Sequence, residues 1–503
     1  MKLNKIFKHS ATNVAIVTAL SLGLAACGGD INLESNVDNS VGDTVVTNPS
    51  PTTPTTPDEV LPGKANSALS TQVSAALGFD VQIQVLDTRI TESTTLVAND
   101  SNGNAVMYAL SGGVDVGGLS ANKQARGVDD VVLTIEPGTV VFGQSGNDYL
   151  VIHRDAKIMA EGTKTSPIIM TSLQDVQGET TDSGQWGGLV ILGNAPSNKC
   201  PTDGSDCALQ VEGVGEGAVF GGTDWEDDSG ALKYLVVKYA GYEIAPDNEL
   251  NGITFGGVGS GTKVEYIQVH DNADDGVEFF GGTVNAKYVV LTGNKDDSVD
   301  WDNGYRGNLQ YVLVKHADNN GEANRAIEAD NDGSTPNKEP QSNPTIANMT
   351  IIGNDFNTAD KSSEGIYLRE GTKAQLHNFV VTGSSGMGEC LEIEGGSTSS
   401  VTAEQAENGD TVISNSVFAC SENFKDAKAE DGTVLLNVED WVLNQNDDNS
   451  TATDMGTVLN GIFTIDTTTP KDFTGNTFFD NADHIGAVTE GNDWTVGWTV
   501  GLE

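Results

Sequence analysis

A short pattern of apolar positions recurs through the middle of the chain. It reads apolar, any residue, Tyr or Asn, apolar, any residue, apolar, and its copies begin at residues 232, 264, 286, 309, 346, 376 and 413. A second apolar pattern alternates with it, at residues 253–255, 277–279, 299–301, 327–329, 366–368 and 391–393. Both patterns have a period of two, which places alternate residues on opposite faces of a strand.

Units of 20 to 30 residues with two or more short strands, separated by Gly, Asn and Asp, indicate stacked coils. The sequence therefore predicts an all-β fold, a parallel β-helix or solenoid. Stacking also predicts ladders, because equivalent positions on successive coils become neighbours. The third position of the first pattern forms an aromatic run that passes into an asparagine run, and we expect stacked rings followed by amides bonded from coil to coil. These residues are Tyr234, Tyr266, Tyr288, Tyr311, Asn348, Asn378 and Asn415.

The N-terminal segment has the features of an export signal. Residues 1–26 combine three early lysines with an apolar stretch that is too short to span a bilayer. The sequence around Cys27, Leu-Ala-Ala-Cys-Gly, resembles the bacterial lipobox, in which the cysteine is acylated and becomes the new N-terminus. With Gly28 as the next residue, the resemblance implies a lipid anchor in the outer membrane of a Gram-negative host.

The rest of the chain divides into three parts. Residues 27–62 are rich in Thr and Pro and predict a disordered tether. Residues 63–425 are assigned to the β-helix and residues 426–503 to C-terminal coils and a cap. A short helix within residues 65–78 is expected to cover the first coil, and the coils are expected to begin by about residue 95.

Charge and cysteine content narrow the possible partners and the compartment. The chain has 26 Lys and Arg against 72 Asp and Glu, a net charge of −46, which argues against nucleic acid and against an anionic membrane surface. Besides Cys27, four cysteines remain, and an even number in an exported chain predicts disulfides. We expect a Cys200–Cys207 bond that closes an inserted loop, and a Cys390–Cys420 bond.

Several segments resemble a group of bacterial cell-surface β-helix lipoproteins. They are Ile135 to Thr139, Ala160 to Thr163, Pro167 to Ser172, Trp186 to Gly193 and the ending from Asp483 to Trp498. The resemblance covers residues 130–503 and implies a right-handed, pectate-lyase-like solenoid displayed at the cell surface. It implies no particular activity.

Acidic residues recur at the coil spacing, and they are the strongest chemical signal in the sequence. Successive coils lie about 4.8 Å apart, so stacked carboxylates repel one another unless something compensates their charge. Calcium is one compensation, since it binds six to eight oxygen ligands. Nearby arginines are another (Arg306, Arg325 and Arg369), and a third reading is that the acids cap turns and point apart into solvent. The candidate metal ligands are Asp274, Asp275, Glu278, Asp296, Asp297, Asp300 and Glu328.

Two classes of function follow from these features. The first is a binding or structural role, adhesin-like or receptor-associated, through an acidic and calcium-binding face, with a glycan or an outer-membrane protein as partner. The alternative is a calcium-dependent lyase or hydrolase acting on acidic extracellular glycans, with Lys295, Tyr305 and Arg306 as its catalytic set. Known catalytic signatures of such enzymes are absent, which favours the first class. Trp494 and Trp498 are expected to pack in the cap, with a carbohydrate-stacking platform as the alternative.

Overall fold

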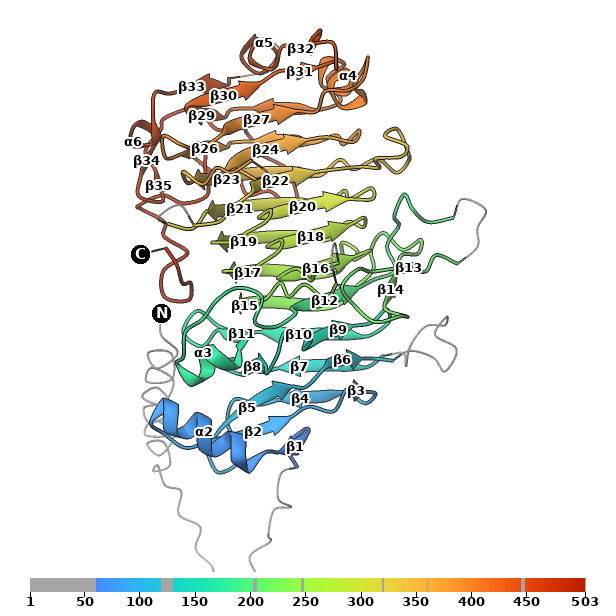
Figure 1. Cartoon of the computed structure of the whole chain (residues 1–503), viewed down its shortest axis with the longest axis vertical. Coiled ribbons are helices and arrows are strands. Elements are labelled where there is room, and N and C mark those ends of the chain that lie inside the picture. Colours follow the sequence, from blue (N-terminus) through green and yellow to red (C-terminus); the bar gives the residue numbers. More distant parts are fainter. Residues whose placement is uncertain are drawn as a thin grey trace, which may run out of the picture.

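The computed structural model describes residues 60–118, 130–201, 206–245, 248–318, 321–359, 361–444 and 448–502. Parallel strands stack along one axis and form two long sheets, which we call sheet A and sheet B (Figure 1). The parallel β-helix predicted from the repeats is confirmed. The predicted signal segment, Cys27 and nearly all of the tether lie outside the described residues.

Within the described residues, sheet A has 18 strands. Those of its N-terminal part are β1 (Lys64–Ala65), β2 (Val81–Val85), β4 (Thr94–Leu96), β5 (Ala105–Leu110), β7 (Val132–Ile135), β8 (Val140–Gly143), β10 (Lys157–Glu161) and β11 (Ile168–Ser172). The others are β15 (Gly230–Lys238), β17 (Lys263–His270), β19 (Asn285–Thr292), β21 (Asn308–Lys315), β23 (Thr345–Gly353), β25 (Gln375–His377), β26 (Val380–Gly383), β28 (Val412–Ser414), β29 (Val417–Ala419) and β33 (Ser450–Thr451).

Sheet B has 11 short strands in the part of the chain that the structure describes. They are β3 (Arg89–Ile90), β6 (Gly113–Val116), β9 (Tyr149–Ile152), β12 (Leu189–Leu192), β16 (Ile253–Gly256), β18 (Val277–Phe280), β20 (Val299–Asp302), β22 (Arg325–Ala329), β24 (Glu364–Leu368), β27 (Glu389–Ile393) and β30 (Glu422–Lys425). Separate hairpins are made by β13 (Leu209–Gln210) with β14 (Val219–Phe220), β31 (Ala427–Lys428) with β32 (Val434–Leu436), and β34 (Leu459–Asn460) with β35 (Phe463–Thr464). The helices are α2 (Ser67–Leu77), α3 (Leu173–Gln177), α4 (Val401–Glu407), α5 (Val438–Asn444) and α6 (Met455–Val458).

The long strands of sheet A each turn a corner at the Tyr or Asn of the first sequence pattern. These residues have left-handed backbone angles, for example φ 55° at Tyr266 and φ 62° at Asn378, and the strand register skips them. The corner divides sheet A into two faces, so that each central coil has three. The predicted aromatic stack is confirmed, with ring centroids 4.5 Å apart for Tyr234–Tyr266 and 4.3 Å for Tyr266–Tyr288.

The prediction that stacked asparagines bond to one another from coil to coil is wrong, because their side chains bond to other partners. Asn348 donates its amide to the carbonyl of His484, and Asn378 accepts from the amide of Lys471. These bonds hold residues 470–502, which we call the C-terminal strap, against the outer face of sheet A (Figure 1). The expected cap over the last coil is made instead by α4, α5 and the β31–β32 hairpin at the top of Figure 1.

The strap also settles the position of the two C-terminal tryptophans. Trp494 is 7% exposed and Trp498 is 1% exposed, and both pack edge-on against the tyrosine stack. Their indole nitrogens donate to backbone carbonyls. They pack along sheet A rather than over the end of the solenoid, and the carbohydrate platform is excluded because their faces are buried.

The N-terminal helix is confirmed as α2, and Asn66 caps it by accepting from the amide of Leu69. The coils begin at residue 81, where β2 pairs in parallel with β5, which agrees with the expected start by about residue 95. Both predicted disulfides are present, with Cα atoms 5.1 Å apart for Cys200–Cys207 and 5.7 Å for Cys390–Cys420. No helix of the described ranges has the length and apolar character needed to cross a bilayer.

Candidate functional site

Acidic side chains occupy the outer face of sheet B where β18, β20 and β22 lie side by side. Their register pairs Glu278 with Asp300, and Asp300 with Glu328. The neighbouring residues of each strand, such as Phe279 and Trp301, point inward and are buried in the core. Strand alternation therefore places one carboxylate per coil on the same line. The second position of the second repeated strand pattern predicted this ladder.

A second row of carboxylates lies in the turns that lead into these strands. The amide of Asp297 donates to Asp275 at 3.0 Å, and the amide of Arg325 donates to Asp297 at 2.7 Å. Each carboxylate thus caps the next coil, as the turn-capping reading expected. The capping does not spread the charges apart, because the two rows converge.

Three overlapping triads join the two rows, and within each triad one carboxylate oxygen per residue lies within 4.8 Å of the others. The members of the triads form what we call the acidic site. They are Asp275, Glu278, Asp296, Asp297, Asp300 and Glu328. Six of the seven predicted ligands are therefore brought together. Asp274 belongs to none of the triads. Burial and the nearby Asp296 raise its pKa to about 8.

Burial and mutual repulsion make this site electrostatically unfavourable. Burial is the main cause that raises the pKa values of Asp275, Glu278, Asp297 and Asp300 well above the ordinary range, and the neighbouring carboxylates add to it. Oδ1 of Asp300 is inaccessible to solvent and accepts no hydrogen bond within the described chain. A buried oxygen without a donor is costly, so the site favours a proton or a cation there.

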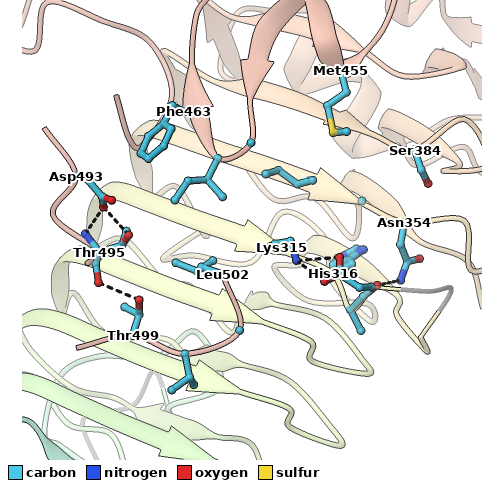
Figure 2. Close-up of a pocket in the computed structure, with 18 of the residues that line it drawn as sticks. Lys315, His316, Asn354, Ser384, Met455, Phe463, Asp493, Thr495, Thr499 and Leu502 are labelled. Atoms are coloured by element: carbon cyan, nitrogen blue, oxygen red, sulfur yellow. Dashed lines mark hydrogen bonds and ion pairs between the residues drawn. The ribbon is translucent and has the colours of Figure 1, made fainter. Parts of the chain in front are cut away.

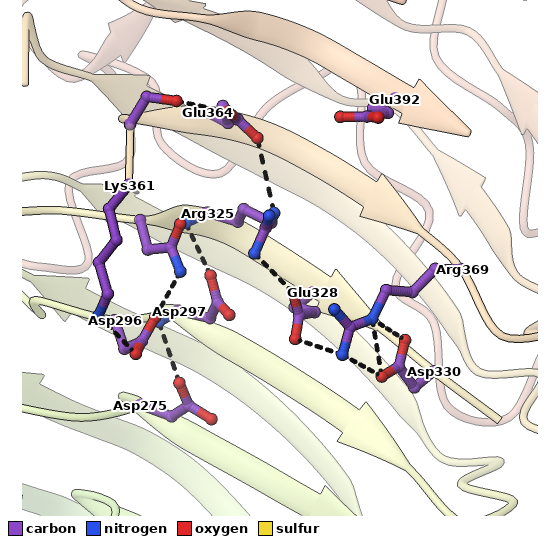
Figure 3. A network of polar contacts seen from close by, with 12 residues as sticks. Asp275, Asp296, Asp297, Arg325, Glu328, Asp330, Lys361, Glu364, Arg369 and Glu392 are labelled. Carbon is purple, nitrogen blue, oxygen red and sulfur yellow. Dashed lines mark hydrogen bonds and ion pairs between the residues drawn. The ribbon is translucent and has the colours of Figure 1, made fainter. Parts of the chain in front are cut away.

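Protein cations compensate one end of the site (Figure 3). Arg325 lies 2.6 Å from Glu328, Arg369 lies 3.0 Å from the same carboxylate, and Lys361 lies 2.7 Å from Asp296. Both guanidinium groups also stack on the ring of Tyr367. The expectation that arginines compensate the stacked carboxylates is therefore correct for the Glu328 end of the ladder.

The other end has no such partner. Among the described residues, no Lys or Arg forms an ion pair with Asp275, Glu278 or Asp300. The amide of Asn251 donates to Glu278 at 2.5 Å. The ladder thus changes from compensated to uncompensated between β22 and β18, and an added cation would be stabilised most at the β18 end.

The donor atoms of the site are all oxygens. Carboxylates without His or Cys suit a hard cation such as Ca²⁺ or Mg²⁺ rather than zinc. Calcium accepts the larger and less regular set of ligands, which fits carboxylates contributed by several coils. The acidic clusters could hold a metal ion, and the chemistry of the donors fits the calcium expected from the sequence.

The catalytic set of the enzymatic alternative does not come together. Tyr305 is buried, stacks on Phe279 in the core and donates its hydroxyl to the carbonyl of Val284. Lys295 precedes β20 and pairs with Asp182, whereas Arg306 follows β20 and is exposed. These three residues therefore share no groove. Of the basic residues proposed from the sequence, Arg325 and Arg369 reach the acidic site.

Sequence reasoning missed several residues around the site. Asp302 and Asp330 lie two positions after Asp300 and Glu328, at the end of β20 and just after the end of β22. Strand alternation places them on the outer face, so the pattern could have revealed them. Glu212 comes within hydrogen-bonding reach of Glu278 and had no signal, because it lies in an inserted segment.

A separate groove of about 1020 Å³ lies between the C-terminal strap and the end of sheet A (Figure 2). Its walls are partly apolar, with Ile352, Phe463 and Leu502. The charged groups near its floor are already paired, since Lys315 lies 2.9 Å from Asp318. The groove gathers no set of uncompensated polar groups comparable to the acidic site.

Comparison with known proteins agrees with the architecture. No curated protein matches the chain, and neither does any solved structure. The profile of the pectate-lyase-like β-helix domain matches residues 124–499, which is most of the chain. The protein therefore belongs to the family of pectate-lyase-like β-helix domains.

Proposed function

We propose that this protein is a lipid-anchored surface module that binds calcium at the acidic site and has a binding or structural role. The observation that carries the proposal is the run of buried carboxylates at Asp275, Glu278 and Asp300, which has no cationic partner among the described residues. A divalent cation there would remove the repulsion and join the two coils of β18 and β20. The same face would then present a rigid, acidic surface to a glycan or an outer-membrane protein.

The geometry favours binding over catalysis on acidic glycans. An enzyme of that class needs a free base and a free cation beside the substrate. Around the acidic site, Arg325 and Arg369 are already engaged by Glu328, Glu364 and Asp330. Tyr305 is buried in the core, so it cannot reach a substrate on this face.

Thermal unfolding with calcium and with chelator tests the proposal. A ligand that binds only the folded state stabilises it by RT ln(1 + [L]/Kd), about 2.7 kcal/mol at a hundredfold excess over Kd. We expect the Tm of the full-length protein to rise with millimolar calcium and to fall back after addition of EDTA. Magnesium at equal concentration should raise the Tm less.

Asp300→Asn provides the site-specific control, with Asp228→Asn as its match. Asp300 belongs to two triads, whereas Asp228 is exposed and pairs with Lys157 far from the site. We expect the calcium shift to be lost in the first variant and kept in the second. Equal calcium shifts in the two variants would contradict the assignment of the site.

A further inference from the structure

The two arms that flank the Cys200–Cys207 disulfide, residues 194–201 and 206–222, are bonded to the coils of the solenoid. The outgoing arm, residues 194–201, crosses the turns of four successive coils at about one residue per coil. Its backbone bonds to Gly257, Gly282 and Asn303, at 2.7, 2.9 and 2.9 Å. The side chain of Asn198 then donates to Asn331 at 2.9 Å. This arm therefore runs along the axis of the solenoid, beside the coils that carry the acidic site.

The returning arm, residues 206–222, is held by a buried cation and by apolar packing. Arg154, 8% exposed, donates to the carbonyls of Cys207 and Gly221, both at 2.7 Å. Beyond the disulfide, Val211 and Phe220 are buried in a cluster with Phe280, which follows Glu278 by two residues on β18. The disulfide and this cluster together fix the path of the chain through residue 212.

This path brings Glu212 to the uncompensated end of the acidic site. Its carboxylate lies within hydrogen-bonding reach of Glu278, and it remains exposed on the side that faces solvent. Two carboxylates at this distance repel unless a proton or a cation lies between them. Glu212 lies outside the three triads but beside Glu278, where it can supply an additional oxygen ligand.

Asn251 gives an independent indication of a ligand at the same point. It is 1% exposed, and its amide nitrogen donates to Glu278 and to Thr254. Its Oδ1 is buried and has no hydrogen-bond partner within the described chain. Amide carbonyl oxygens are common calcium ligands, and a buried one without a donor is otherwise unfavourable.

We propose that Glu212 binds the same cation as Glu278, and that the Cys200–Cys207 disulfide positions it there. The arm that follows the disulfide, residues 206–222, is then part of the cation site. This inference rests on the proposed calcium-binding function and names the element that completes it.

Calorimetric titration of the full-length protein with calcium chloride tests the inference. Glu226→Gln is a matched control, because Glu226 follows the same arm, is exposed and loses the same charge. We expect Glu212→Gln to weaken calcium binding about tenfold, since affinity follows the number of charged ligands, and Glu226→Gln to change it less than about twofold. If the wild type binds calcium and the two variants bind it with equal affinity, the role of Glu212 is overturned, but the proposed calcium binding is not. A wild type that binds no calcium would overturn the proposed function itself.

The role of the disulfide is tested by two paired replacements. Cys200→Ser with Cys207→Ser should weaken calcium binding, because residue 212 is no longer held near Glu278. Cys390→Ser with Cys420→Ser removes a disulfide of buried residues away from the site and should lower the Tm without changing calcium affinity. Unchanged affinity in the first pair would overturn the positioning role. If either pair fails to fold, the comparison of Glu212→Gln with Glu226→Gln still decides the inference.

Discussion

At the scale of single residues, the corner of each coil shows how a sequence position becomes a conformation. The left-handed region costs a residue with a Cβ about 1–2 kcal/mol. Asparagine tolerates it, which suits Asn348, Asn378 and Asn415. Tyrosine does not favour it, so the stacking of rings 4.3–5.0 Å apart offsets the strain at Tyr266, Tyr288 and Tyr311. The repeating position was visible in the sequence, but its backbone angle was not.

A buried histidine gives a prediction at this scale. His316 is 2% exposed, its Nδ1 is 2.7 Å from the hydroxyl of Ser363, and burial lowers its pKa to about 4. The unfolded chain binds a proton near pH 6.5. Between these values the unfolded state holds more protons, so this residue destabilises the fold as the pH falls from about 6.5 to about 4, by up to about 3 kcal/mol.

Urea unfolding of the wild type and His316→Gln at pH 7 and pH 5 measures this contribution. Other groups titrate alike in both proteins, so the difference between the two pH dependences isolates His316. We expect the wild type to lose more stability than the variant on acidification. An identical loss in both would show that His316 does not carry this dependence.

At the scale of elements, the C-terminal strap is the feature that most changes the picture of the fold. It lies along sheet A through matched side-chain bonds, such as the pair between Gln268 and the backbone of Val500 at 2.7 and 2.9 Å. Lys287 adds an ion pair to Asp480 at 2.9 Å. The strap covers the tyrosine stack with Trp494 and Trp498, so the outer face of sheet A is protected over several coils.

Hydrogen exchange tests how the strap is held. Trp498→Ala removes a buried side chain, which costs about 3–5 kcal/mol of stability. We expect this cost to exceed the free energy of local unfolding of the strap, which is held at one face only. Amides of residues 494–502 should then exchange faster, while those of β18 and β20 keep their protection. Val496→Ala is the control in the same segment, because Val496 is 57% exposed. Uniformly faster exchange across the solenoid would mean that the strap and the coils unfold as one unit.

At the scale of the whole molecule, a net charge of −46 is spread along a narrow stack of coils. Such a charge keeps the protein soluble but opposes compaction. The acidic site concentrates this repulsion where β18, β20 and β22 meet, and Arg325 and Arg369 relieve only one end. Calcium from the medium would relieve the other end, so the proposed function predicts that the stability of the solenoid depends on the cations around it.

The proposed lipid anchor also belongs to the scale of the whole molecule. The proposal predicts that Cys27 carries the acyl chains that hold the body at the outer membrane. Metabolic labelling with a clickable fatty acid should mark the wild type and leave Cys27→Ala unlabelled. The four other cysteines form disulfides, so label on the wild type reports Cys27. Labelling of Cys27→Ala to the wild-type level would contradict the anchor.

The sequence by itself determined the coil, its register and most of the acidic site. Equivalent positions of a repeated strand pattern become neighbours on successive coils, which is why Glu278, Asp300 and Glu328 could be placed on one line before the structure was known. The same period-two alternation also predicts that Asp302 and Asp330 lie on the outer face.

The tertiary structure alone decided the contacts that cross the repeat. Glu212 reaches Glu278, and residues 470–502 lie on sheet A, through paths of loops that no period in the sequence encodes. It also decided that Tyr305 faces the core rather than a groove. The physical reason is that repeated strands are positioned by local hydrogen bonding, whereas insertions and termini are positioned by whichever surface buries them best.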